Sequence, residues 1–249
     1  MKPANLPEAW FQVTLYSDFC ILDTWVVTLF HSFQRNHAVP FSPEFLILRI
    51  PAILIALTVH ECAHGWIALR LGDRTAYEAG RISLNPFVHL DLFGTMMLLF
   101  GPFGWAKPVP VDHRYFEKPK QGTVLVSAAG PGSNILLALF FGYILRFSGP
   151  DTANSYFGKF LALSVLINSG IAFFNLLPVP PLDGSKIILG MLPDRLIPGY
   201  IRNSKYIPPI FMTLLMIEWI AHIPVFSRLI NPLFIPFNTI IRFLIYWRF

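Results

Sequence analysis

The chain has 249 residues, of which 54% are hydrophobic and only 13% charged, and its mean hydropathy is +0.55. A soluble domain usually carries about 25% charged residues, so this composition excludes an ordinary soluble domain and indicates a polytopic membrane protein. The net charge is +5, but the basic residues stand singly or in small groups at the ends of apolar stretches. That distribution is typical of membrane loops and argues against nucleic-acid binding.

The apolar stretches, taken in chain order, predict a bundle of about five to six transmembrane helices. Residues 10–33 are apolar but contain Asp18 and Asp23, whose charges are costly at mid-bilayer. They form either an extra transmembrane helix or an interfacial helix, and the sequence slightly favours the interfacial one. Residues 91–103 are apolar but fall short of the roughly 20 residues that a spanning helix needs. The other stretches are predicted as spans: 45–71, 123–147, 156–177, 207–226 and 229–247.

Loop charges predict the orientation of these spans. Most Lys and Arg residues fall in two sets, between residues 70 and 120 and between residues 186 and 205. By the positive-inside rule both sets are expected to be cytoplasmic. An even number of crossings must then separate residue 71 from residue 122. We therefore predict an all-α polytopic membrane fold with a re-entrant segment in this interval. Three regions follow: an N-terminal helix in 1–44, a catalytic membrane core in 45–190 and C-terminal transmembrane helices in 191–249.

One apolar span contains the sequence His60-Glu61-Cys62-Ala63-His64. Helix positions four apart lie about 40° apart around the axis, so both imidazoles can reach one metal ion. Glu61 lies about 100° from His60, where it can touch a metal-bound water as general base without being a ligand. Cys62 points away from such a metal. The alternative, two packed helix histidines, is disfavoured because three ionisable residues inside a membrane span are costly and usually functional.

A catalytic zinc site needs three protein ligands, so the chain must supply another. Asp183 is the candidate, because it follows a span on the same side as His64 and lies after a proline-rich segment that cannot stay helical. The alternative for Asp183 is a capping role at the next helix. Asn175 could stabilise a developing oxyanion or link two helices.

These motifs together resemble the site-2 protease family of intramembrane zinc metalloproteases. The resemblance rests on HECAH at 60–64 and NLLPVPPLDG at 175–184, and it extends to GRISLNPFVHLD at 80–91, GWAKPVPV at 104–111 and AGPGSN at 129–134. It resembles the compact prokaryotic branch of the family, without a PDZ or CBS domain, and covers about residues 50–189.

The resemblance implies roles for individual residues. His60, His64 and Asp183 match the zinc ligands, for one Zn²⁺ per chain, and Glu61 matches the catalytic glutamate. Asn175 matches an asparagine that holds the substrate or stabilises the intermediate. The stretch around Trp105, Lys107 and Val109 matches a membrane-associated β-hairpin whose edge could bind substrate by strand addition. Asn134 matches a position in a helix of the family's catalytic core, and we predict that it belongs with these substrate-binding residues.

The predicted function is therefore hydrolysis of peptide bonds within or near the transmembrane segments of other membrane proteins. The resemblance suggests single-span substrates such as membrane-bound anti-sigma factors or signal-peptide remnants. It also suggests a prokaryotic inner membrane, with the active site toward the cytoplasm. Two alternatives remain at this stage: a metal transporter or receptor that uses the same residues without hydrolysis, and an inactive scaffold. The sequence predicts no oligomeric state.

Overall fold

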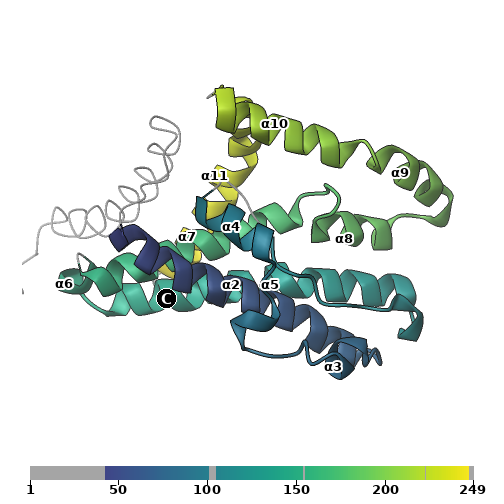
Figure 1. Ribbon diagram of the computed structural model, residues 1–249, viewed down its shortest axis with the longest axis horizontal. Coiled ribbons are helices and arrows are strands. Elements are labelled where there is room, and N and C mark those ends of the chain that lie inside the picture. The colour runs from purple at the N-terminus through teal and green to yellow at the C-terminus, as the bar shows by residue number, and fades with distance from the viewer. Residues whose placement is uncertain (1–42, 101–104, 154, 222, 247–249) are drawn as a thin grey trace, which may run out of the picture.

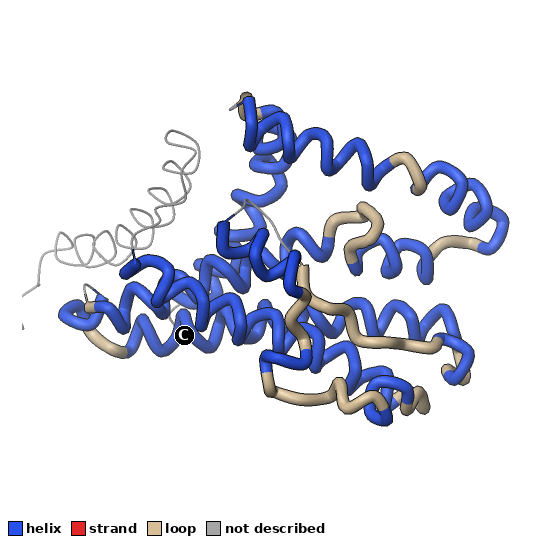
Figure 2. The backbone as a smooth tube through the Cα atoms, in the orientation of Figure 1, coloured by secondary structure: helices blue, strands red, loops and turns tan. Residues whose placement is uncertain are grey.

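The computed structural model describes residues 43–100, 105–153, 155–221 and 223–246, and within these ranges the chain forms helices and no strands (Figures 1 and 2). Almost all of the predicted N-terminal region 1–44 lies outside the described residues. The described helices are α2 (Pro43–Arg70), α3 (Thr75–Glu78), α4 (Leu92–Phe100), α5 (Pro119–Phe147), α6 (Pro150–Ala153), α7 (Tyr156–Leu176), α8 (Asp183–Met191), α9 (Ile197–Ser204), α10 (Ile207–Ala221) and α11 (Val225–Tyr246).

Four of these helices are long and apolar enough to cross a membrane: α2, α5, α7 and α11. This agrees with the predicted helical membrane fold. The predicted span at 207–226 is shorter than expected, because α10 ends at Ala221. Proline lacks an N–H group and disfavours helical geometry in the residue before it, so Pro224 separates α10 from α11. The apolar part of α10, Ile207–Glu218, is accordingly among the shorter helices.

Helix α5 lies at the centre of the bundle. It packs against α2, α7, α8 and α11. Helices α2, α5 and α7 contact one another and lie side by side along the molecule (Figure 1). The largest buried apolar cluster joins α5 to α7 and α11. Its members include Phe141 and Leu145 from α5, Leu161 from α7 and Ile245 from α11. Helix α5 thus connects this cluster to α2, the helix that carries the histidines.

The interval between α2 and α5 differs in part from the prediction. Residues 105–111 form an extended loop and not a β-hairpin, and the pairing observed in the described part of this interval is one isolated antiparallel bridge between Leu90 and Ala106. Pro108 and Pro110 have no N–H group, so this stretch lacks the donors that a strand ladder requires. Helix α4 is nine residues long, about 14 Å, and is too short to cross a bilayer. A re-entrant path for it stays a prediction.

Candidate metal centre

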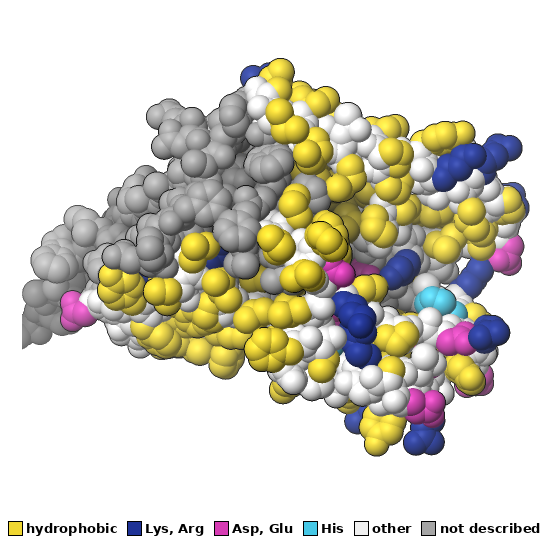
Figure 3. Space-filling model, in the orientation of Figure 1, with side chains coloured by type: hydrophobic (Ala, Val, Ile, Leu, Met, Phe, Trp, Pro, Cys, Tyr) yellow, Lys and Arg dark blue, Asp and Glu magenta, His cyan; other side chains and the backbone are white. Residues whose placement is uncertain are grey.

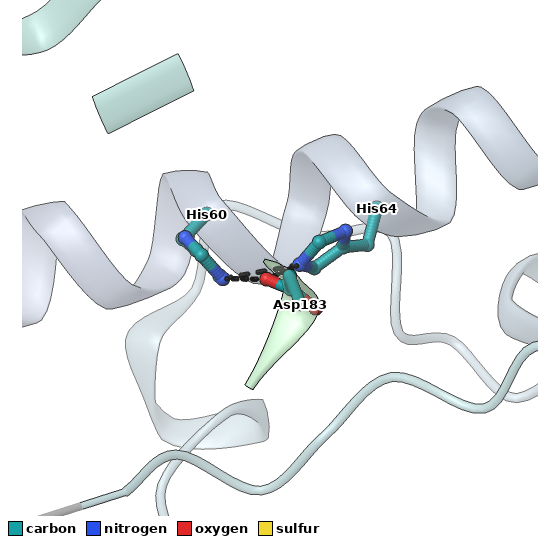
Figure 4. Close-up of side chains that lie close together, drawn as sticks. All are labelled: His60, His64 and Asp183. Atoms are coloured by element: carbon teal, nitrogen blue, oxygen red, sulfur yellow. Dashed lines mark hydrogen bonds and ion pairs between the residues drawn. The ribbon is translucent and has the colours of Figure 1, made fainter. Parts of the chain in front are cut away.

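Three buried side chains converge between α2 and the start of α8 (Figure 4). His60 and His64 project from the same face of α2, and their Nε2 atoms are 3.0 Å apart. Oδ2 of Asp183 lies 3.2 Å from Nε2 of His60 and 3.1 Å from Nε2 of His64. The three residues predicted as metal ligands are thus brought together, although 119 positions separate His64 from Asp183.

The other nitrogen of each imidazole fixes which atom faces the centre. Nδ1 of His64 donates to the carbonyl oxygen of Val126 at 2.7 Å, and Nδ1 of His60 donates to Oδ1 of Asn134 at 2.6 Å. A neutral imidazole that donates through Nδ1 presents a lone pair at Nε2. Two such lone pairs and a carboxylate oxygen therefore point at one another, and this arrangement calls for a cation between them.

The separations fit zinc. A tetrahedral zinc ion with bonds of about 2.0–2.2 Å holds its ligand atoms about 3.3–3.6 Å apart. The distances of 3.0, 3.1 and 3.2 Å are slightly shorter than this range, so a small outward movement of the side chains would admit the ion. Gly130 of α5 leaves room at the same point, because a Cβ built there would lie 2.6 Å from Nε2 of His60 and closer still to Nε2 of His64. Two imidazoles and one carboxylate are a donor set that catalytic zinc sites use.

Asp183 reaches the histidines because the chain turns sharply after α7. Helix α7 ends at Leu176, and the Pro180–Pro181 segment leads into α8. Asp183 is the first residue of α8, and its carboxylate faces α2, which favours the ligand role over the capping role. Gly184 permits the close approach, since a Cβ there would meet the backbone of Leu177 and Leu176.

A cation beside Asp183 favours the charged form of its carboxylate. The second oxygen, Oδ1, lies 3.7 Å from Nζ of Lys186, one turn further along α8. A deprotonated carboxylate is the form that a metal ligand requires.

Glu61 lies beside the histidines and is not one of the three converging residues. It is buried, and its Oε2 accepts a hydrogen bond of 2.9 Å from the backbone N–H of Val109. The prediction that Val109 contacts a substrate needs correction on this point, because its side chain is also buried and its N–H is already used by Glu61. Trp105 and Lys107, in the same loop, are exposed, and their contact with substrate stays a prediction.

Asn134 lies in a core helix, as the resemblance implied, but not at a substrate-binding position. It is fully buried, so it is not available to a substrate. Its amide nitrogen donates to the carbonyl oxygen of Ala56 at 3.0 Å and to Oδ1 of Asn168 at 2.9 Å, while its oxygen accepts from His60. Asn168 in turn donates to the carbonyl oxygen of Ser164. Asn134 therefore orients His60 and ties together α2, α5 and α7 at the level of the site.

Asn175 lies near the end of α7, where its amide donates to the carbonyl oxygen of Ile171 in its own helix at 3.0 Å. It is half-buried, and its oxyanion role stays a prediction. Sequence reasoning assigned no role to Gly130, Val126 or Asn168. Gly130 and Asn168 carried a signal, since one belongs to the AGPGSN motif and the other is a polar residue within an apolar span. Val126 contributes a backbone carbonyl, which no residue pattern predicts.

Comparisons with known proteins place the chain in a family. The model of "Peptidase family M50" matches residues 143–217, a range that includes Asn175 and Asp183. A Bacillus subtilis protein named "Putative zinc metalloprotease YwhC" is 43% identical over 147 residues, which are 57% of this chain and 67% of that protein. The chain belongs to peptidase family M50. Family membership and the four apolar helices make it an integral membrane protein. Family membership also makes it a metallopeptidase.

More distant M50 relatives carry the same kind of name. A Mycobacterium tuberculosis protein named "Putative zinc metalloprotease Rip2" is 31% identical over 148 residues, which are 55% of this chain and 54% of that protein. MJ0611 of Methanocaldococcus jannaschii is 28% identical over 150 residues, 59% of this chain and 73% of that protein. The aligned region thus spans from about half to three quarters of these relatives. No solved structure matches the chain significantly.

Proposed function

We propose that this M50 protein is a zinc endopeptidase that hydrolyses peptide bonds within or near the transmembrane segments of other membrane proteins. The observation that carries the proposal is the convergence of His60, His64 and Asp183 inside a bundle of apolar helices. Buried ionisable groups in such a setting are costly unless they are functional. Their donor set matches zinc, and Glu61 next to them supplies a base.

The depth of the site supports a reaction inside the membrane. At a rise of 1.5 Å per residue, His64 and His60 lie about 9 and 15 Å from Arg70, the last residue of α2. A hydrocarbon core is about 30 Å thick. On the face seen in Figure 3, most Lys and Arg side chains gather toward the end with α3, α8 and α9, and hydrophobic side chains are the commonest coloured ones on the rest of the described surface. We place this basic end in the cytoplasm, so that water and the site share one side.

Glu61 and the three candidate metal ligands have separate roles in the proposed reaction. When bound, zinc supplies Lewis-acid chemistry, because it polarises a carbonyl and lowers the pKa of water. Glu61 accepts a proton from the attacking water as the water oxygen bonds to the peptide carbonyl carbon. The carbon–nitrogen bond then breaks, and Glu61 passes the proton to the leaving amine nitrogen. His60, His64 and Asp183 hold the metal, and Asn134 holds the ring of His60 in place.

The substrate class follows from the burial of the site. A transmembrane helix hides its peptide carbonyls in hydrogen bonds, so a substrate must unwind locally before Glu61 and the metal can act on it. Single-span proteins, such as a membrane-bound anti-sigma factor or a signal-peptide remnant, are the substrates that we propose. A transporter is a weaker proposal, because the described residues contain one metal-ligating group and not the succession of polar sites that a transport path needs.

The experiment is cleavage of a fluorescent single-span peptide by the full chain in liposomes, with products identified by mass spectrometry. Wild type should cut within or next to the apolar segment. Glu61→Gln should retain zinc and lose cleavage, because glutamine cannot accept the proton. Cleavage by Glu61→Gln at the wild-type rate would refute the assignment of the base. Cleavage by neither protein would refute the peptidase proposal for this class of substrate.

A further inference from the structure

The position of Glu61 depends on a loop that lies far from it in the sequence. Its carboxylate accepts from the backbone N–H of Val109, 48 residues away. Val109 lies in an irregular segment, residues 105–112, which is anchored at one end by the bridge between Ala106 and Leu90 and at the other by the Asp112 N–H bound to Asp73. A general base must stay within hydrogen-bond reach of the proton that it abstracts. Whatever fixes this loop therefore also fixes the base.

Arg81 binds the loop next to Val109. Its Nη2 atom donates to the carbonyl oxygen of Lys107 at 2.6 Å and to that of Pro108 at 3.2 Å. The Pro108 carbonyl shares a planar peptide unit with the Val109 N–H group, so holding that carbonyl also sets the direction of the N–H. Among the described residues Arg81 forms no ion pair, and its charge is directed at these carbonyls. Hydrogen bonds from a charged donor are roughly twice as strong as neutral ones.

Arg81 is itself fixed to the helix that carries the histidines. Gly80 has a φ of 65°, which reverses the chain after α3 and lets the N–H of Arg81 donate to the carbonyl oxygen of Ala76 at 2.8 Å. Ala76 is fully buried against α2. At Gly65, next to His64, an added Cβ would lie 3.4 Å from Ala76 and 3.3 Å from Val109. The segment 75–81, which contains α3, and the loop 105–112 thus meet on one face of α2.

We propose that Arg81 is a positioning residue for the hydrolysis: it holds Lys107 and Pro108 so that the N–H of Val109 keeps the Glu61 carboxylate aimed at the metal centre. This inference rests on the proposed function, because it gives Arg81 a role in the same reaction. Arg81 touches neither the metal ligands nor Glu61 directly. Its loss should therefore impair turnover and leave metal binding intact.

The first measurement is kinetic and uses the full chain in liposomes. Arg81→Gln should lower kcat about 10- to 100-fold, the range typical of supporting contacts around a metal site, with KM and zinc content little changed. Arg81→Lys keeps a charged donor and should restore most of the activity. Arg74→Gln is the matched control, since Arg74 lies at the start of α3 over the ring of Tyr77. This substitution should leave kcat unchanged. Wild-type kcat in Arg81→Gln would overturn the inference.

A second measurement separates this inference from the peptidase proposal. Hydrogen exchange read by mass spectrometry should show faster exchange in residues 105–112 of Arg81→Gln, with α5 unchanged. This result does not depend on finding a substrate. Unchanged exchange in the loop would overturn the positioning role even if the protein is a peptidase. Faster exchange across the whole bundle would overturn it as well, because it would mark a general loss of stability.

Discussion

Nδ1 of His60 in α2 lies 2.6 Å from Oδ1 of Asn134 in α5, and this bond joins the metal centre to the middle of the bundle. The amide of Asn134 is held in turn by Ala56 and Asn168, so its oxygen cannot rotate away from the imidazole. The bond sets the tautomer of His60 and aims Nε2 at Asp183. The packing of α2, α5 and α7 around Asn134 therefore also sets the orientation of His60.

Asn134→Ala should weaken zinc binding about 10- to 100-fold, because His60 loses the acceptor that fixes its tautomer and ring orientation. Competition with a chromophoric chelator measures the affinity in detergent. Ser133→Ala is the control, since the Ser133 hydroxyl bonds only within its own helix, to Gly130. Equal zinc affinity in Asn134→Ala and wild type would show that the bond does not support the site.

Gly130→Ala should remove most of the bound zinc, because the added methyl group would lie among the ligand atoms, 2.6 Å from Nε2 of His60. Gly132→Ala, two residues along α5, has no heavy atom within 4 Å of the new Cβ and should bind zinc as wild type does. Both changes raise helix propensity by the same amount, so the pair isolates the steric effect. Metal analysis of the purified variants measures it, and full zinc occupancy in Gly130→Ala would contradict the geometry.

Glu218→Ala should lower the stability of the α10–α11 turn by about 1–2 kcal/mol, as the loss of a helix cap does. The buried Glu218 carboxylate accepts from the N–H of Ser227 at 2.8 Å and also from its hydroxyl, near the start of α11. Thermal unfolding in detergent reports the change. Thr213→Ala, exposed on the same helix and bonded only to Pro209, should have little effect. Equal melting temperatures for the two variants would argue against a capping role.

The helicity of the substrate should control cleavage. Replacing glycine residues near the cut site of a substrate with alanine stabilises its helix by about 1 kcal/mol per residue. The rate should fall accordingly, because Glu61 and the metal centre can act only on an unwound carbonyl. Rates on paired substrate peptides in the same liposomes measure this. A rate that does not respond to substrate helicity would mean that unwinding is not required.

The convergence of the three candidate ligands could be predicted from the sequence, because ionisable residues are rare in apolar membrane spans. His60 and His64 are costly in an apolar span, and Asp183 follows a proline-rich break at a matching depth. The long helices were likewise predictable, since their apolar runs are close to the thickness of a bilayer. The helix boundaries at Arg70, Phe147 and Leu176 agree with those predictions to within a residue.

The contacts around the ligands were not predictable in the same way. Asn134 was placed with the substrate contacts, but it is buried against His60, because only tertiary packing decides which helix face an asparagine occupies. The loop at 105–111 was expected to be a hairpin, but its prolines and the Arg81 contacts leave it irregular. Val109 acts through its backbone N–H, a group that every residue except proline has and that no side-chain pattern reveals.

The zinc content per chain of the purified wild-type protein and of Asp183→Ala tests the three-ligand centre itself. We expect one zinc per wild-type chain and a clear loss in the variant, because two histidines alone leave the ion short of a ligand. Thr152→Ala, in a helix outside the site, should retain the wild-type content. Wild-type protein without zinc, or an Asp183→Ala variant that binds zinc as tightly as wild type, would contradict the three-ligand centre on which the mechanism depends.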